Sequence, residues 1–181
     1  MAKLISKTYG DALFEAAVDK QCIDRLFEEA QAVLTAFSDN PDFAGLMTHP
    51  QILKEQKLKI VEEVFKDRVS DEMTGFLEIV IRKDRFAEIE QIFCYFISRV
   101  KEYKGIGVAF VAAPMELSVL QKEEVEKKLL ETTSYQKMEI HYEVDETLIG
   151  GMVIRIGDRV VDSSIRTKLE ELKRQLLKVR L

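Results

Sequence analysis

The sequence predicts a mostly α-helical protein in two parts: a helical N-terminal part, then a small α/β part with a short sheet and a terminal helix. Apolar residues recur at helical spacing from residue 3 to about residue 104. After Gly105-Ile106-Gly107, short apolar and alternating runs typical of strands begin. We therefore expect one domain over residues 1–104 and a second over residues 105–181.

The composition argues against several classes of protein. The chain has 181 residues and a formal net charge of -5, which argues against wholesale nucleic-acid binding. No apolar run reaches membrane-spanning length, and residues 1–7 lack the apolar segment of a signal peptide. Cys22 and Cys94 lie far apart, and His49 and His141 lack cysteine partners at ligand spacing. We therefore expect buried free thiols in a reducing cytoplasm, and no metal or other cofactor.

Six helices are expected in the N-terminal part, and local signals mark their limits. The second, over residues 23–37, has the most regular amphipathic pattern. Asn40-Pro41 begins the third, with asparagine as the cap and proline at the first helical position. The fourth covers residues 53–67. Ser70 caps the fifth, and Lys83-Asp84-Arg85 separates it from the sixth.

The first and fifth helices carry more apolar surface than one core contact requires. The fifth ends in residues 76–81, which are apolar except for Glu78. The first is apolar on two sides, with Phe14 and Val18 opposite a face that carries Ile5, Tyr9, Ala12, Leu13 and Ala16. Both helices therefore have apolar surface available for a second contact.

The C-terminal part begins with a strand over residues 108–113, which Pro114 ends. Ser118 and Gln121 form a capping-box pattern that opens a helix to about Thr132. Residues 138–144 alternate between apolar and polar side chains, which predicts a half-buried strand with His141 on the side that faces water.

Residues 148–165 hold the most specific local pattern of the chain. Gly150-Gly151 breaks the chain, residues 152–156 and 159–161 form two short strands, and Gly157-Asp158 suits a type II′ hairpin turn. Asp162-Ser163-Ser164 then offers three N-caps for the last helix. These glycines lack the spacing of a nucleotide-binding loop and lie at strand ends and a turn, so we do not expect a phosphate site.

The last helix has an apolar stripe at heptad spacing, formed by Ile165, Leu169, Leu172, Leu176 and Val179. About two heptads are too few to define a coiled coil. The helix either packs on its own domain or binds a partner. A membrane-surface helix is a weaker alternative, because this one is short and lacks an aromatic anchor.

Catalytic motifs are not evident in the sequence. Asp145, Asp158 and Asp162 each lie at a turn or cap, where aspartate is expected to bond to the backbone. The sequence therefore favours a binding or structural protein, with an enzyme that has a dispersed site as an alternative.

Residues 144–166, followed by Leu169-Glu170-Glu171-Leu172, closely resemble the C-terminal signature of the delta subunit of F-type ATP synthases. The mitochondrial relative is the oligomycin-sensitivity-conferring protein. Residues 9–17 resemble the family's Tyr-Ala-x-Ala-Leu first helix, with Gly10 where alanine is common. The segment Ala113-Pro114-Met115-Glu116-Leu117-Ser118 with Gln121, and the pair Arg85-Phe86, match further segments in order.

This resemblance implies a non-catalytic stator subunit of the peripheral stalk. It implies an N-terminal six-helix bundle on the catalytic head, where the N-terminal helices of the alpha subunits bind, one of them between the first and fifth helices. It also implies that the C-terminal domain joins the C-terminus of the stalk b subunit. The protein would resist rotor torque on the cytoplasmic face of a bacterial cell membrane.

Two sets of site residues follow from combining the resemblance with the apolar pattern. The expected groove for the alpha subunit, some of whose members belong to the core, comprises Tyr9, Ala12, Leu13, Ala16, Leu77, Ile79 and Val80. The expected stalk-binding domain includes Gly150, Gly151, Asp162, Ile165, Leu169, Leu172 and Leu176. The functional alternative is an all-helical RNA-binding module of the antitermination type, which 15 basic against 19 acidic residues in residues 1–104 disfavour.

Overall fold

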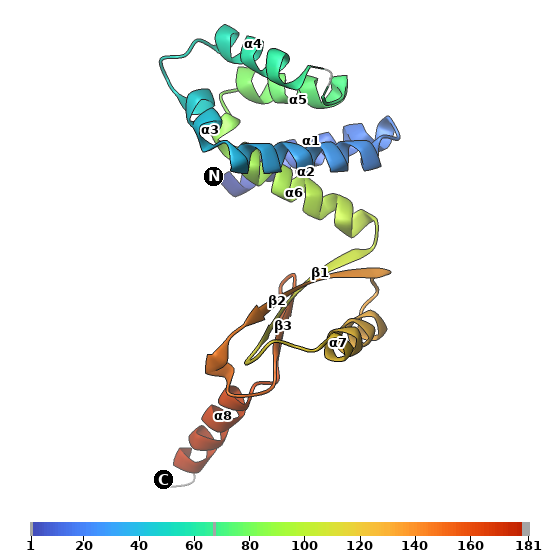
Figure 1. Cartoon of the computed structure of the whole chain (residues 1–181), viewed down its shortest axis with the longest axis vertical. Coiled ribbons are helices and arrows are strands. Elements are labelled where there is room, and N and C mark those ends of the chain that lie inside the picture. Colours follow the sequence, from blue (N-terminus) through green and yellow to red (C-terminus); the bar gives the residue numbers. More distant parts are fainter. Residues whose placement is uncertain (1, 67, 179–181) are drawn as a thin grey trace. The chain divides into compact units, whose positions relative to one another are not determined.

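The computed structural model describes residues 2–66 and 68–178 and divides the chain into two compact units, Met1–Lys101 and Glu102–Leu181. The protein is mostly helical, and its small four-stranded sheet lies in the second unit (Figure 1). The division falls in the last turn of the helix that ends at Tyr103, close to the boundary expected from the sequence.

The first unit is helical throughout its described part. Its elements are α1 (Ala2–Asp19), α2 (Ile23–Asp39), α3 (Pro41–Thr48), α4 (Lys54–Phe65), α5 (Asp71–Arg82), the 3₁₀-helix η1 (Phe86–Glu88) and α6 (Ile89–Tyr103). They share one apolar core, in which Ile92, Phe93 and Phe96 of α6 are completely buried. Each of these helices therefore buries one face in a shared core.

Two cap predictions for this unit had different outcomes. The prediction for Ser70 is confirmed, because its hydroxyl accepts a hydrogen bond from the backbone N–H of Met73. For Asn40 the predicted position is confirmed, because it is the N-cap residue of α3 with Pro41 in the first turn, but its side-chain amide donates to the carbonyl of Ala36 at the end of α2 and makes no capping bond to α3. Asparagine can bond to either flanking helix, and here the preceding helix offers a free carbonyl.

The second unit is a small α/β structure. Its elements are β1 (Ile106–Ala113), α7 (Val119–Thr132), β2 (Lys137–Val144), the 3₁₀-helix η2 (Glu146–Leu148), β3 (Val153–Ile156), β4 (Arg159–Asp162) and α8 (Ile165–Lys178). The strand order is β2-β1-β3-β4, with β1 and β2 parallel and the other pairs antiparallel. A parallel pair needs a crossover, which α7 provides.

Local signals explain these elements. The capping box of Ser118 and Gln121 forms at the start of α7 as predicted. Gly157 has φ +55, whereas Asp158 does not have a positive φ, which is the pattern of a type II′ turn. That turn joins Ile156 to Arg159 in the β3–β4 pair.

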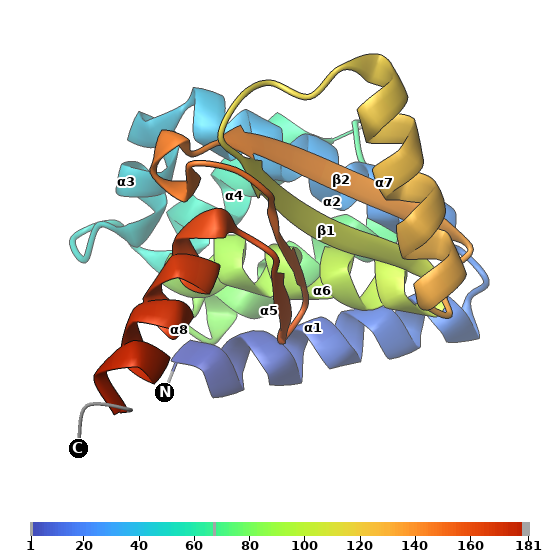
Figure 2. The same ribbon diagram turned by 90° about the horizontal axis from the view of Figure 1, so that it is seen from below.

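One face of the sheet is covered by α7 (Figure 2). Ala109 and Val111 of β1 are buried against Val125 and Leu129 of α7. His141 points away from this core and is exposed, as its place in the alternating pattern predicted. The prediction of two buried cysteines is only partly right, since both are free but Cys94 is exposed and Cys22 is half-buried.

Candidate protein-binding surfaces

The structure separates the seven expected groove residues into two groups. Leu13, Leu77 and Val80 lie in the core of the first unit, with at most 3% of their surface exposed, so they support the helices from inside. By contrast, Ala12 and Ala16 on α1 and Ile79 on α5 are exposed, and Tyr9 is half-buried. These four side chains are the part of the expected groove that a partner could reach.

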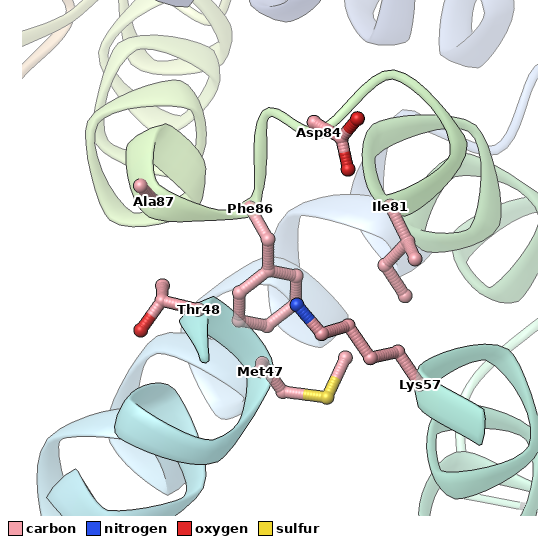
Figure 3. A pocket seen from close by; sticks show the side chains of 7 residues that line it. All are labelled: Met47, Thr48, Lys57, Ile81, Asp84, Phe86 and Ala87. Carbon is pink, nitrogen blue, oxygen red and sulfur yellow. The ribbon is translucent and has the colours of Figure 1, made fainter. Parts of the chain in front are cut away.

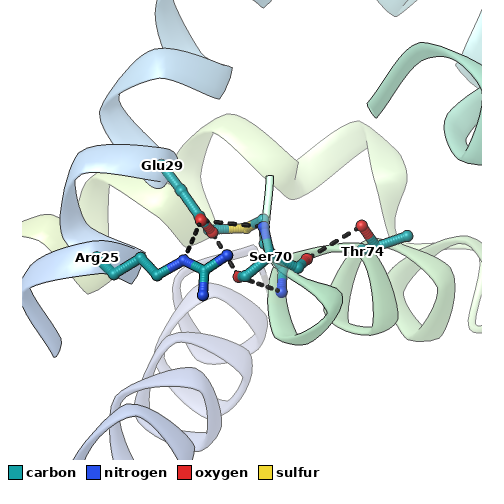
Figure 4. Close-up of polar contacts among 5 residues, drawn as sticks. Arg25, Glu29, Ser70 and Thr74 are labelled. Carbon is teal, nitrogen blue, oxygen red and sulfur yellow. Dashed lines mark hydrogen bonds and ion pairs between the residues drawn. The ribbon is translucent and has the colours of Figure 1, made fainter. Parts of the chain in front are cut away.

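A polar network holds the start of α5 on α2 (Figure 4). Glu29 accepts a hydrogen bond from the backbone N–H of Ser70 at 2.9 Å and another from its hydroxyl at 2.6 Å. Arg25 donates to the same carboxylate at 3.0 Å, and Thr74 donates to the Ser70 carbonyl at 3.1 Å. These bonds fix the position from which Ile79 extends about two turns later, at about 3.6 residues per turn.

A second link joins the end of α1 to α5. Lys20 pairs with Glu72 in the first turn of α5 at 3.1 Å. The pKa of Glu72 is lowered by hydrogen bonds from backbone N–H and from Lys20, as expected for a carboxylate at a helix N-terminus. The two helices that were expected to form the groove are therefore tied at this end.

The second apolar side of α1 packs on α6. Arg99 of α6 lies over the ring of Phe14, 5.6 Å from its centroid, and the hydroxyl of Tyr95 donates to Asp11 at 3.0 Å. A Cβ atom at Gly10 would collide with the ring of Tyr95, so glycine allows α6 to approach α1 closely here. Part of the surplus apolar surface expected on α1 is thus used within the unit.

Hollows elsewhere in the first unit differ in size. One near the end of α5 has a volume of about 110 Å³ and lies beside Met47, Ile81 and Phe86 (Figure 3). This is well below the roughly 300 Å³ of a small-molecule site.

A second hollow of the first unit, of about 400 Å³, is bounded by α2, α3, α4 and the segment after α4, and its lining includes Ala32, Ala36, Phe43 and Val64. The sequence analysis did not predict this hollow. The pair Ala32 and Ala36, one turn apart on α2, was the one sequence feature that could have indicated it, because small side chains leave space.

In the second unit, the Gly150-Gly151 segment anchors the start of α8. The carbonyl of Gly150 accepts a hydrogen bond from the N–H of Ile165 at 2.9 Å. Gly151 has φ +76, and a Cβ atom there would collide with the backbone of Ser163. Both the left-handed conformation and this close approach require glycine, so the pair is structural, as the sequence predicted.

Among the three candidate caps, Ser164 caps α8. Its buried hydroxyl accepts a hydrogen bond from the N–H of Thr167 at 3.2 Å. Asp162 supports this cap by accepting bonds from the Thr167 hydroxyl at 2.7 Å and from the Ser164 N–H at 2.8 Å. These bonds, with the nearby charge of Arg166, lower the pKa of Asp162, and hydrogen bonds from Thr147 likewise lower the pKa of Asp145.

The stripe along α8 is uncovered in the described structure. Its exposed fractions are 43% for Ile165, 52% for Leu169, 53% for Leu172 and 64% for Leu176. Val179, the last member of the expected stripe, lies outside the described residues. Two main alternatives were given for this helix: packing on its own unit or binding a partner. The first is wrong for the described residues, because the stripe does not pack on the unit.

Chemical sites were sought over the same residues. In residues 2–66 and 68–178, no group of three or more histidine, cysteine, aspartate or glutamate side chains could hold a metal ion. None of the described helices has both the length and the apolar character that crossing a membrane requires. The geometry that stands out is instead that of exposed apolar side chains on well-anchored helices.

Known proteins match the chain from end to end. The family model described as ATP synthase delta (OSCP) subunit matches residues 5–176. ATP synthase subunit delta of Lachnoclostridium phytofermentans is 50% identical over 181 residues, with all of both chains covered. The chain belongs to the ATP synthase delta (OSCP) subunit family.

Other matches agree with this assignment. The subunit delta of Alkaliphilus oremlandii is 36% identical, with 99% of each chain covered. A chain in the mitochondrial ATP synthase of Toxoplasma gondii shares the fold, with a TM-score of 0.78 over 95% of this chain and 97% of that one, at 18% identity.

As a delta/OSCP-family member, the protein is a component of the peripheral stalk of an F-type ATP synthase and is not a catalytic subunit. The resemblance stated from the sequence is confirmed, and the RNA-binding alternative is not supported.

Proposed function

We propose that the protein links the catalytic head of the ATP synthase to the peripheral stalk and resists the torque of the rotor. The observation that carries this proposal is the presence of exposed apolar side chains in both compact units of a delta-family chain. A link between two bodies needs one binding surface for each, and the chain offers a candidate in each unit.

The first unit would bind the head. In this proposal α1 to α6 form a six-helix bundle within residues 1–104, and an alpha-subunit N-terminal helix lies along Tyr9, Ala12, Ala16 and Ile79. Gly75 of α5, one turn before Ile79, has open space where its side chain would be. Small residues on both helices would let a partner backbone approach, with Ile79 supplying apolar contact area.

The second unit would bind the stalk. In this proposal residues 105–181 form the stalk-binding domain, and the C-terminal helix of the b subunit packs along Ile165, Leu169, Leu172 and Leu176. The anchored start of α8 supports this role, because the hydrogen bonds at Gly150, Asp162 and Ser164 fix the first turn of the helix to the segments beside it. The proposed location is the cytoplasmic face of a bacterial cell membrane, reached only through the complex.

A pull-down from solubilised membranes of the source bacterium tests the link. The tagged full-length protein is expected to recover the alpha and beta subunits together with the stalk subunit. A Leu169→Asp/Leu172→Asp variant is expected to keep the alpha and beta subunits and lose the stalk subunit, because charges would enter an apolar interface. Recovery of neither the head nor the stalk by the wild-type protein would contradict the proposed function.

A further inference from the structure

Within the described residues of the second unit, one face of the sheet is covered by α7 and the other face is not covered by a helix. Alternate residues of β1 are buried beneath α7, whereas Phe110, which points to the other face, is 46% exposed. Val160 of β4 is 59% exposed. We call this uncovered side the open face, and the pairing register assigns to it Phe110, Ala112, His141, Glu143, Val153, Arg155 and Val160.

The centre of the open face is an ordered row of side chains across all four strands. Strand register places His141, Phe110, Arg155 and Val160 side by side. The ring of His141 stacks on Phe110 with centroids 5.0 Å apart, and the Arg155 guanidinium lies 4.9 Å from the Phe110 centroid. Stacking restricts these rotamers before any partner arrives, which lowers the entropic cost of binding.

A hollow of about 490 Å³ lies beside this row. Besides the row itself, its lining includes Ala112, Val153 and Glu143. In the residues that the structure describes, neither Arg155 nor Glu143 forms an ion pair. The open face thus combines an apolar hollow, a pre-ordered aromatic ring, and one charge of each sign outside any ion pair of the described structure.

The size of a stable interface indicates which partner binds the open face. The 14 residues of α8 span about 21 Å, so one face roughly 10 Å wide offers a footprint on the order of 200 Å². A stable interface buries about 800 Å² on each partner. The described part of the α8 stripe is smaller than such an interface, and a second contact on the same unit would enlarge it.

We propose that the open face is this second contact and that it binds a helix of the peripheral-stalk subunit, an inference that rests on the proposed function. Glu143 on β2 and Arg155 on β3 are separated by the width of two strand spacings and by two residues along the strand direction. Their Cα atoms are therefore about 12 Å apart. At 1.5 Å per residue, roughly 12 Å corresponds to eight residues of a helix. The partner helix therefore carries an acidic and a basic residue about two turns apart, with an aliphatic residue between them over Ala112.

The test measures binding of the soluble part of the stalk subunit from the same organism to the full-length protein by calorimetry. Arg155→Glu is expected to raise Kd at least about tenfold, because it places like charges together. Arg159→Glu is the matched control: the same change on the adjacent strand, at a position paired with Ile156, which faces α7. It is expected to change Kd less than about twofold.

A second readout does not depend on the charge variant folding correctly. The chain contains no tryptophan, so Phe110→Trp supplies a single reporter at the centre of the open face. Its emission is expected to shift to shorter wavelength when the stalk fragment binds, whereas a Val161→Trp reporter on the other side of β4 is not expected to shift.

Two results would count against these proposals in different ways. If the wild type binds the fragment but Arg155→Glu leaves Kd unchanged and the Phe110→Trp emission does not shift, this inference is overturned and the proposed function stands. Failure of the wild type to bind the fragment would contradict the proposed function itself.

Discussion

Glu29 on α2 accepts hydrogen bonds from both the backbone N–H and the hydroxyl of Ser70, the residue that caps α5. Its side chain is only 13% exposed, so the contact is shielded from water. The two residues are 41 positions apart, and their contact joins the second helix of the unit to the fifth. This carboxylate therefore acts together with the buried side chains of α5 to set the orientation of the helix and the position of Ile79.

Replacing Glu29 with alanine is expected to lower the free energy of unfolding by about 1–3 kcal/mol, since hydrogen bonds to a charged group are lost and a cap loses its support. Urea denaturation measures this change. Glu28→Ala, an exposed neighbour on the same helix, is the control and is expected to change stability by less than about 0.5 kcal/mol. Equal effects of the two substitutions would show that the network does not hold α5.

Gly151 and Gly157 both have positive φ but differ in their surroundings. Gly151→Ala is expected to destabilise the protein by about 2 kcal/mol or more, because strain and a collision with the Ser163 backbone add together. Gly157→Ala has open space and is expected to cost about 1 kcal/mol. Thermal unfolding followed by circular dichroism compares them, and a reversed order would contradict the structural account of the Gly150-Gly151 segment.

Gly10→Ala sets two effects against each other. Alanine raises helix propensity by up to about 1 kcal/mol, but its Cβ would meet the ring of Tyr95. Because Tyr95 is half-buried and bonded to Asp11, we expect the collision to prevail and the free energy of unfolding to fall, as urea denaturation would measure. The double variant Gly10→Ala/Tyr95→Ala is expected to be more stable than Tyr95→Ala alone. If Gly10→Ala by itself stabilises the protein, the close approach of α1 and α6 is wrong.

Asp162 makes the stability of the second unit depend on pH. Its pKa is lowered in the folded state, so its contribution is present above the ordinary pKa of aspartate and is lost as pH falls through the folded value. Asp162→Asn is therefore expected to lower the melting temperature near pH 7, and the difference from wild type is expected to shrink below about pH 4. Asp158→Asn, in the exposed hairpin turn, serves as the control at each pH. A constant difference across this range would contradict the assigned role.

The sequence predicted those features that depend on neighbouring residues. Ser70 and Ser118 were identified as caps because the bonds they make lie within one turn of helix. The type II′ turn followed from Gly157-Asp158 for the same reason. The fold class followed from the change in periodicity after residue 104, which is also local.

Features that depend on distant neighbours could not be predicted in the same way. The faces of α1 and α5 that are buried depend on which helices pack against them, so Leu13, Leu77 and Val80 could not be separated from Ala12 and Ile79. The sequence pattern also does not predict that β1 pairs with β3 as well as with β2, the next strand along the chain. The open face could not be recognised either, since its residues come from four separate strands.

The head-binding side of the proposed link is tested most directly by titrating a synthetic N-terminal peptide of the alpha subunit into the full-length protein by calorimetry. Ala12 is exposed on α1, so Ala12→Asp leaves the core intact and places a charge on the proposed binding surface. The wild type is expected to bind the peptide, and Ala12→Asp, with an unchanged circular dichroism spectrum, is expected to lose detectable binding. Equal binding by the folded variant and the wild type would contradict the proposed surface on α1 and α5.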